Sequence, residues 1–226
     1  MKTYGQYCPI ARGSEIFAER WTPLIVRNLM LGCHSFSEIH AGLPGISRTL
    51  LTQRLRTLGR AGVVETRPTA NGRGSLYYLT PQGQDLHDVV HALGTWGARW
   101  LELAPPDLDA GVALWSMCRL MERDRLPERP VLIRFEIPDD ARKRLWVLVQ
   151  RPEPEVCRRP PALDEDLVVT ASSEWLVKWH MGRISLREAR RRGFVTVEGP
   201  ASVVRALESW GGLSTYADVP SVGAAR

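Results

Sequence analysis

The stretch GISRTLLTQRLRTLGRAGVV, residues 45–64, decides the fold of the first half of the chain. Its serine, Ser47, can cap a helix that continues for about four turns. The apolar positions of that helix fall within about 60° of one another on the helix surface. They are Leu51, Leu55 and Leu58. We therefore predict an amphipathic helix that buries one face and exposes the other.

The predicted exposed face carries hydrogen-bond donors and acceptors and no acidic side chain. Arginine pairs with guanine edges, glutamine pairs with adenine, and threonine contacts phosphates or thymine methyl groups. We predict that the capping residue and the exposed face of this helix contact DNA. The residues are Ser47, Arg48, Thr49, Thr52, Gln53, Arg56 and Arg60. Taken alone, the same pattern fits a solvated helix face equally well.

The elements on either side favour a DNA-binding fold. Residues 22–31 predict a helix that ends at Gly32, and Ser35 caps a short helix through Ile39. A glycine-containing turn, residues 41–45, joins that short helix to the amphipathic one. Two helices joined in this way predict a helix-turn-helix.

A β-hairpin is predicted directly after the second helix. Residues 63–67 and 75–80 read as strands around a tip that contains Asn71-Gly72, a strong turn signal. A hairpin at this place is typical of a wing, and Arg67 and Arg73 would lie beside the DNA backbone or minor groove. From Arg48 to Arg73 there are six arginines and one acidic residue. This charge predicts salt-sensitive binding to double-stranded DNA.

Residues 5–103 resemble the HxlR family of winged-helix bacterial regulators. The motifs that carry the resemblance are Tyr7-Cys8-Pro9, Arg20-Trp21-Thr22, Phe36-Ser37-Glu38-Ile39, Gly45-Ile46-Ser47, Leu51 through Leu58, Ala61-Gly62-Val63-Val64 and Tyr78 through Gly83. The resemblance implies a homodimer that forms through the N-terminal segment and the last helix and binds a two-fold operator. This sequence departs from the family at Arg60, where an acidic residue is usual, and lacks the usual proline before the second wing strand.

We expect one further helix from Pro81 to about Leu103, with a broad apolar stripe suited to a dimer interface. Packing onto its own domain explains the stripe nearly as well. His87 and His91 have a spacing that can hold a metal ion, but the sequence offers no suitable third ligand. We therefore predict no metal site and no cofactor.

The four cysteines are far apart and we interpret them as free thiols. Cys8 matches the N-terminal Cys-Pro position at which some HxlR-type regulators carry a redox-sensing or quinone-sensing cysteine. The sequence favours a structural role for Cys8, because little around it would lower the thiol pKa.

The composition of the whole chain limits the class of protein to which it can belong. The 226 residues include 44% apolar residues and carry a net charge of +5, as in an ordinary globular protein. Prolines 105 and 106 divide the sequence into a first domain, residues 1–104, and a second domain, residues 105–226. No segment is apolar enough to cross a membrane or act as a signal peptide, so we expect a cytoplasmic protein that does not associate with membranes.

The second domain predicts an α+β fold with a mostly antiparallel sheet. The expected strands are residues 131–137, 144–150, 167–170 and 194–198, with a short edge strand around Val156. The expected helices are residues 108–125, 172–181, a short helix opened by Ser185, and 200–210.

This order is similar to the sterol carrier protein type 2 domain over about residues 107–213. The motifs include Asp166 through Val169, Trp175-Leu176 to Met181-Gly182, Ser185 through Ala189, Gly193 through Pro200, and Leu207 to Trp210. The resemblance implies an apolar tunnel between sheet and helices for a lipid-like or other hydrophobic ligand. As a group, the candidates to line it are Trp115, Met121, Trp146, Trp175 and Trp179. Ordinary core packing explains each one singly.

The leading hypothesis is a DNA-binding transcription regulator that responds to a hydrophobic small-molecule ligand. We favour a repressor over an activator. A lipid carrier with a dimerising first domain and a thiol sensor acting through Cys8 are the alternatives. We predict no enzyme, since the sequence shows no Ser-His-Asp order, no paired buried carboxylates and no phosphate-binding loop.

Overall fold

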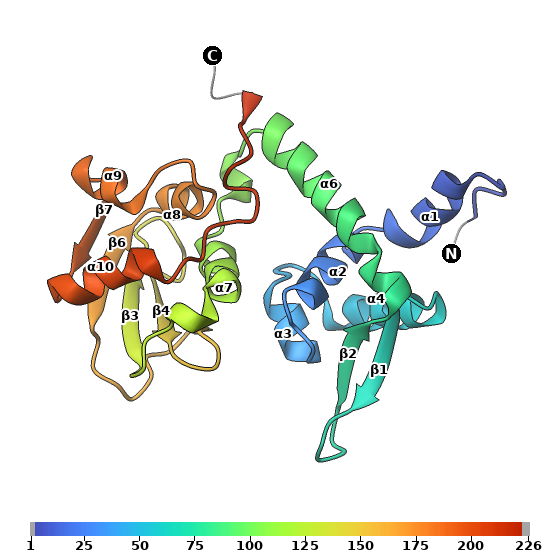
Figure 1. The fold of residues 1–226 in the computed structure, drawn as a ribbon, viewed down its shortest axis with the longest axis horizontal. Helices are drawn as coiled ribbons and strands as arrows, with labels where there is room; N and C mark the ends of the chain where they lie inside the picture. Colours follow the sequence, from blue (N-terminus) through green and yellow to red (C-terminus); the bar gives the residue numbers. More distant parts are fainter. Residues whose placement is uncertain (1–2, 223–226) are drawn as a thin grey trace. The chain divides into compact units, whose positions relative to one another are not determined.

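The computed structural model describes residues 3–222 and separates into two compact units, with the division between Gly94 and Thr95 (Figure 1). The division falls inside helix α6, Leu86–Trp100, and therefore precedes the prolines at which the sequence suggested a boundary. Among residues 3–222, none of the helices combines the length and the apolar composition that a membrane span requires.

The first unit combines helices with a two-stranded hairpin. Its elements are α1 (Pro9–Phe17), α2 (Thr22–Met30), α3 (Phe36–Ala41), α4 (Arg48–Arg60), β1 (Val64–Pro68), β2 (Ser75–Leu79), α5 (Pro81–Gln84) and the first part of α6. The predicted helices at α2, α3 and α4 and the predicted hairpin are confirmed. Helix α1 was not predicted from the sequence.

Local chemistry explains where these helices begin. The Ser35 hydroxyl accepts a hydrogen bond from the Glu38 backbone N–H at 3.2 Å, and the Glu38 carboxylate accepts one from the Ser35 N–H at 2.8 Å. These reciprocal bonds satisfy two backbone donors at the start of α3. At the start of α4, the Ser47 hydroxyl accepts from the Leu50 N–H at 3.2 Å.

The core of the first unit holds α2, α3 and α4 together. Its buried apolar side chains include Ile25, Val26, Leu29, Ile39, Leu43, Leu51, Leu55 and Leu58. Asn28 is fully buried among them, and its side-chain amide donates to the Ile39 carbonyl at 2.9 Å. Arg54 on α4 pairs with Glu19 before α2, at 2.7 Å. These contacts fix the direction of α4.

The prediction of one helix from residue 81 to about residue 103 was wrong in detail. The chain forms α5, capped by the Thr80 hydroxyl, then α6, which ends at Trp100. Ala104 precedes a proline and is extended, with φ −95° and ψ 160°, because the proline ring disfavours helical backbone in the residue before it.

The second unit is an α+β fold around a five-stranded sheet (Figure 1). Its strands are β3 (Val131–Glu136), β4 (Arg144–Val149), β5 (Glu155–Cys157), β6 (Leu167–Ala171) and β7 (Val195–Glu198). Its helices after α6 are α7 (Ala110–Leu120), α8 (Ser173–His180), α9 (Leu186–Arg191) and α10 (Ala201–Ser209), with short 3₁₀ helices at Pro105–Asp107 and Arg123–Arg125.

The strand order is β5-β4-β3-β6-β7. Strands β3 and β6 are parallel, and the other neighbouring pairs of this sheet are antiparallel. The prediction of a mostly antiparallel sheet is therefore confirmed, as is the short edge strand at β5.

One face of the sheet packs against helices. The buried cluster takes alternate residues of β3, Val131, Ile133 and Phe135, together with apolar residues of α7, α8, α9 and α10. Cys118 on α7 lies in this cluster, and burial raises the pKa of its thiol to about 12. Such a thiol stays protonated and inert near neutral pH.

Both ends of helix α7 and the cap of helix α8 differ from prediction. Helix α7 starts at the Asp109 cap and ends at Leu120, because Met121 turns extended and pairs with Gly211. Helix α8 begins where predicted, but the Ser172 side chain does not cap it. Instead the Asp139 carboxylate accepts hydrogen bonds from the Ser173 N–H at 2.9 and 3.1 Å.

The segment after α10 is tied back to α8 and the loop that follows it. The Ser214 N–H donates to the His180 carbonyl at 2.8 Å, and the Arg183 guanidinium donates to the Val219 carbonyl at 2.7 Å. The His180 ring is buried and donates from Nδ1 to the Gly212 carbonyl at 2.8 Å. Burial lowers the pKa of His180.

Candidate nucleic-acid interface

Helix α4 turns one face into the core and leaves the opposite face in solvent. Leu51, Leu55 and Leu58 are buried, as the sequence predicted. The predicted DNA-contacting residues of this helix lie on the other side. Ser47, Arg48, Thr49, Gln53, Arg56 and Arg60 are exposed, and Thr52 is half-buried.

These polar residues differ in what they are free to bind. The Arg48 guanidinium lies 5.0 Å from the centre of the Phe36 ring. The Thr52 hydroxyl donates to the Arg48 carbonyl at 2.9 Å, and the Ser47 hydroxyl caps the helix. Arg56 and Arg60 have no hydrogen bond or ion pair with any described part of the chain. The two unpaired cations are therefore the ones available to an external anion.

A groove of about 480 Å³ separates the second half of α4 from the hairpin. It is lined by Thr52, Leu55, Arg56, Gly59 and Arg60 from α4 and by Thr66 and Tyr77 from the strands. Two guanidiniums and three hydroxyl-bearing side chains line this groove, with no carboxylate. Such a lining matches a phosphate, which accepts hydrogen bonds and carries negative charge.

Thr66 and Tyr77 were not among the predicted site residues. They lie directly opposite each other in the antiparallel register of β1 and β2, so their side chains leave the hairpin on the same face. The Asn-Gly turn sets which residues of the two strands are paired, and strand alternation sets which side each side chain faces. Together they could have indicated that Thr66 and Tyr77 share one face of the hairpin.

The tip of the hairpin is built by a turn that needs glycine. Gly72 has a φ of +67°, which side-chain-bearing residues rarely adopt. The Asn71 side-chain oxygen accepts from the Arg73 N–H at 3.0 Å and stabilises the turn. The Arg73 side chain is exposed at this tip. Arg67 pairs with Glu65, and its guanidinium lies 4.6 Å from the centre of the Tyr78 ring. Its positive charge is therefore partly compensated within the protein.

Comparison with known proteins agrees with this geometry. Residues 16–105 match the family model described as HxlR-like helix-turn-helix. The HTH-type transcriptional regulator YvaP of Bacillus subtilis is 32% identical over 99 residues, which are 43% of this chain and 92% of YvaP. The chain belongs to the HxlR-like helix-turn-helix family.

Other similar proteins have the same kind of name. The HTH-type transcriptional regulator sll1512 of Synechocystis is 32% identical over 43% of this chain and 73% of its own length. Among solved structures, the reduced form of the transcriptional regulator YodB from B. subtilis is 30% identical, with a TM-score of 0.36, over 41% of this chain and 92% of that chain. The chain is a transcriptional regulator of this family and not an enzyme.

Helix α6 of this HxlR-like chain exposes its apolar stripe. None of its residues is buried, and its large exposed apolar side chains are Val89, Leu93, Trp96 and Trp100. Near the start of the chain, Tyr7 and Ile10 are 96% and 79% exposed. Apolar surface of this extent is typical of a protein interface.

The remaining candidates of the HxlR-like unit lie near these surfaces. Cys8 is partly exposed and is the residue that precedes helix α1. The His87 and His91 rings are 6.2 Å apart. Within residues 3–222, no group of three or more His, Cys, Asp or Glu side chains could hold a metal ion.

The five candidates of the second unit are not brought together around one space. Trp115, Met121 and Trp179 are buried, and Trp175 stacks on Phe194 with ring centres 3.7 Å apart. Trp146 lies on the sheet face away from the core, and its indole N–H donates to Glu165 at 2.9 Å.

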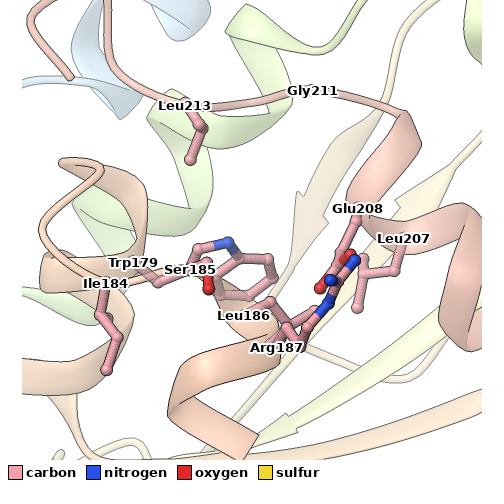
Figure 2. A pocket seen from close by; sticks show the side chains of 9 residues that line it. All are labelled: Trp179, Ile184, Ser185, Leu186, Arg187, Leu207, Glu208, Gly211 and Leu213. Carbon is pink, nitrogen blue, oxygen red and sulfur yellow. The ribbon is translucent and has the colours of Figure 1, made fainter. Parts of the chain in front are cut away.

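Two hollows of very different size adjoin Trp179. The enclosed one, which Met121 also lines, lies between α7 and the sheet and holds about 10 Å³. That is room for about one water molecule and not for a lipid. The other is an open pocket of about 370 Å³ between α8, α9 and α10, shown in Figure 2.

Proposed function

We propose that this HxlR-like regulator binds double-stranded DNA with the exposed face of α4 in the major groove and the hairpin β1–β2 as a wing. The observation that carries the proposal is the acid-free groove between α4 and the hairpin, with the unpaired guanidiniums of Arg56 and Arg60 on its wall. Thr49 and Gln53 lie exposed on the same helix and would meet base edges. Arg73 at the tip would contact the backbone.

We further propose that the regulator is a homodimer that binds a two-fold operator. The apolar stripe of α6 and the exposed residues Tyr7 and Ile10 support this proposal, since a second copy would remove them from water. A two-fold dimer presents two copies of α4, and DNA sites for such dimers are palindromic.

The finer role proposed is that of a repressor controlled by a hydrophobic ligand. In this proposal residues 1–104 bind DNA and dimerise, and residues 105–226 form a sterol-carrier-like ligand-binding domain. The α+β fold of the second unit and the pocket beside Trp179 support it. A coupling of about 1–3 kcal/mol between ligand and DNA would change operator affinity about 5-fold to 150-fold.

Fluorescence anisotropy with genomic DNA fragments tests the DNA-binding proposal. We expect sequence-selective binding that Arg56→Ala weakens at least tenfold, or about 1.4 kcal/mol. The matched control is Arg205→Ala, which removes an exposed arginine from α10. Binding that is indifferent to Arg56→Ala, or lost equally in both variants, would contradict the assignment of α4 as the reading helix.

A further inference from the structure

The open pocket of the second unit has the properties of a small-molecule site. Its volume of about 370 Å³ falls in the usual range for ligand pockets, roughly 300–1,000 Å³. The floor is made by Trp179, Leu186 and Leu207, which are 5%, 2% and 3% exposed. Because these side chains also belong to the buried cluster of the unit, the floor is held in place before any ligand arrives.

The walls of the pocket add a pair of opposite charges. Arg187 projects from α9 and Glu208 from α10, and both line the pocket in Figure 2. Neither side chain forms an ion pair or hydrogen bond with the described residues. The guanidinium can donate to a ligand oxygen, and the carboxylate can accept from a ligand O–H or N–H.

This combination selects a class of ligand. A ligand carboxylate would be attracted by Arg187 but repelled by Glu208, and a ligand ammonium would experience the reverse. A neutral group that both donates and accepts, such as a hydroxyl or an amide, can use both side chains. The flat indole of Trp179 and the leucine side chains suit an apolar or aromatic body.

We propose that the pocket between α8, α9 and α10 is the effector site, and that it binds a neutral aromatic or apolar molecule bearing a hydroxyl or amide group. The effector part rests on the proposed ligand response, whereas the binding part stands on the pocket alone. The location differs from the tunnel between sheet and helices that the sequence suggested.

A hydrogen-bonded link leads from the pocket to α6. Arg183 directly precedes Ile184, which lines the pocket, and its guanidinium donates to the Ala98 carbonyl of α6 at 3.1 Å and to the Val219 carbonyl at 2.7 Å. Ala98 and the pocket belong to the same compact unit. A ligand that displaces residue 184 therefore changes the hold of Arg183 on α6, the helix that continues from the DNA-binding unit.

Binding is tested by calorimetry on the full chain with three probes that share one ring system. They are 2-naphthol, which is neutral, 2-naphthoate, which is anionic, and 2-naphthylmethylammonium, which is cationic. We expect 2-naphthol to bind at one site per chain, about tenfold more tightly than either charged probe. Arg187→Ala and Glu208→Gln should each weaken it by about tenfold, as expected for a hydrogen bond to a charged group.

The matched controls come from the same two helices. Arg190→Ala on α9 and Arg205→Ala on α10 remove exposed arginines that do not line the pocket, and they should leave binding unchanged. All four positions are exposed, so the variants are expected to fold, and circular dichroism checks this. Absent binding of 2-naphthol, a preference for a charged probe, or binding unchanged in Arg187→Ala and Glu208→Gln would overturn the proposed ligand class.

The effector role is tested by hydrogen exchange. Addition of 2-naphthol should change amide exchange in residues 95–103 of the wild type, and Arg183→Ala should bind 2-naphthol yet lose that change. An unchanged α6 in the wild type would refute the effector role. Neither measurement uses DNA, so loss of operator binding with intact 2-naphthol binding would count against the proposed function and not against the pocket.

Discussion

The salt dependence of DNA binding can be worked out from the charges that the structure leaves unpaired. On α4 and the wing, Arg56, Arg60 and Arg73 have no ion-pair partner among residues 3–222, whereas Arg48 lies over a ring and Arg67 pairs with Glu65. A two-fold dimer would therefore bring about six free guanidiniums to the phosphates. Each phosphate contact contributes about −0.9 to the slope of log K against log salt, which gives a slope of about −5.

This slope has a large measurable effect. Raising the salt concentration fourfold should weaken operator binding by roughly a thousandfold. Fluorescence anisotropy over a salt series gives the slope directly. Arg73→Ala removes about two contacts from a dimer and should make the slope less negative by about 2, while Arg205→Ala should leave it unchanged. A wild-type slope shallower than about −2, or one that Arg73→Ala does not alter, would refute this account of the DNA-facing charge.

Three further predictions concern stability. Asp139→Ala should lower the free energy of unfolding in urea by about 1 kcal/mol, because α8 loses its cap, while Ser172→Ala should have little effect. Gly83→Ala should destabilise the chain by about 2 kcal/mol or more, since a Cβ would lie 2.1 Å from the Val63 carbonyl oxygen; Gly59→Ala, with 3.6 Å to its nearest neighbour, should stabilise it by about 0.5 kcal/mol. Burial lowers the pKa of His180 below 6.5, so its contribution to stability is present above pH 6.5 and is lost as the pH falls below that value. Urea unfolding above and below pH 6.5 should show this loss in the wild type and not in His180→Asn.

The parts of the fold that the sequence could predict are those specified by neighbouring residues. The spacing of Leu51, Leu55 and Leu58 and the cap at Ser47 define α4 within one stretch of chain. The Asn71-Gly72 turn defines the hairpin in the same way, because few other residues tolerate its backbone geometry. Each of these signals acts over a few residues and needs no knowledge of the rest of the chain.

The parts that could not be predicted depend on contacts between distant residues. Ser172 is the nearest capping residue to α8, yet the loop between β3 and β4 brings the Asp139 carboxylate to the same position. The pocket beside Trp179 likewise exists only because α9 and α10 pack next to α8. No spacing within one segment could have indicated either feature.

Trp146 shows how strand alternation decides the surroundings of a side chain. It is one of the sequence-based candidates for lining an apolar tunnel. Strand alternation nevertheless places Trp146 opposite to Leu145 and Val147, which lie in the core. A tryptophan with a polar indole N–H can occupy the outer face, where Glu165 accepts its hydrogen bond.

The shortness of edge strand β5 bears on the solubility of the regulator at high concentration. An edge strand offers unpaired backbone groups to any other strand, and this is a common route to aggregation. Strand β5 has three residues and lies between Pro154 and the pair Pro160-Pro161, and proline has no N–H to donate to a neighbouring strand. The short edge between prolines therefore offers few backbone groups for pairing with another sheet, which disfavours association of copies of the chain through β5.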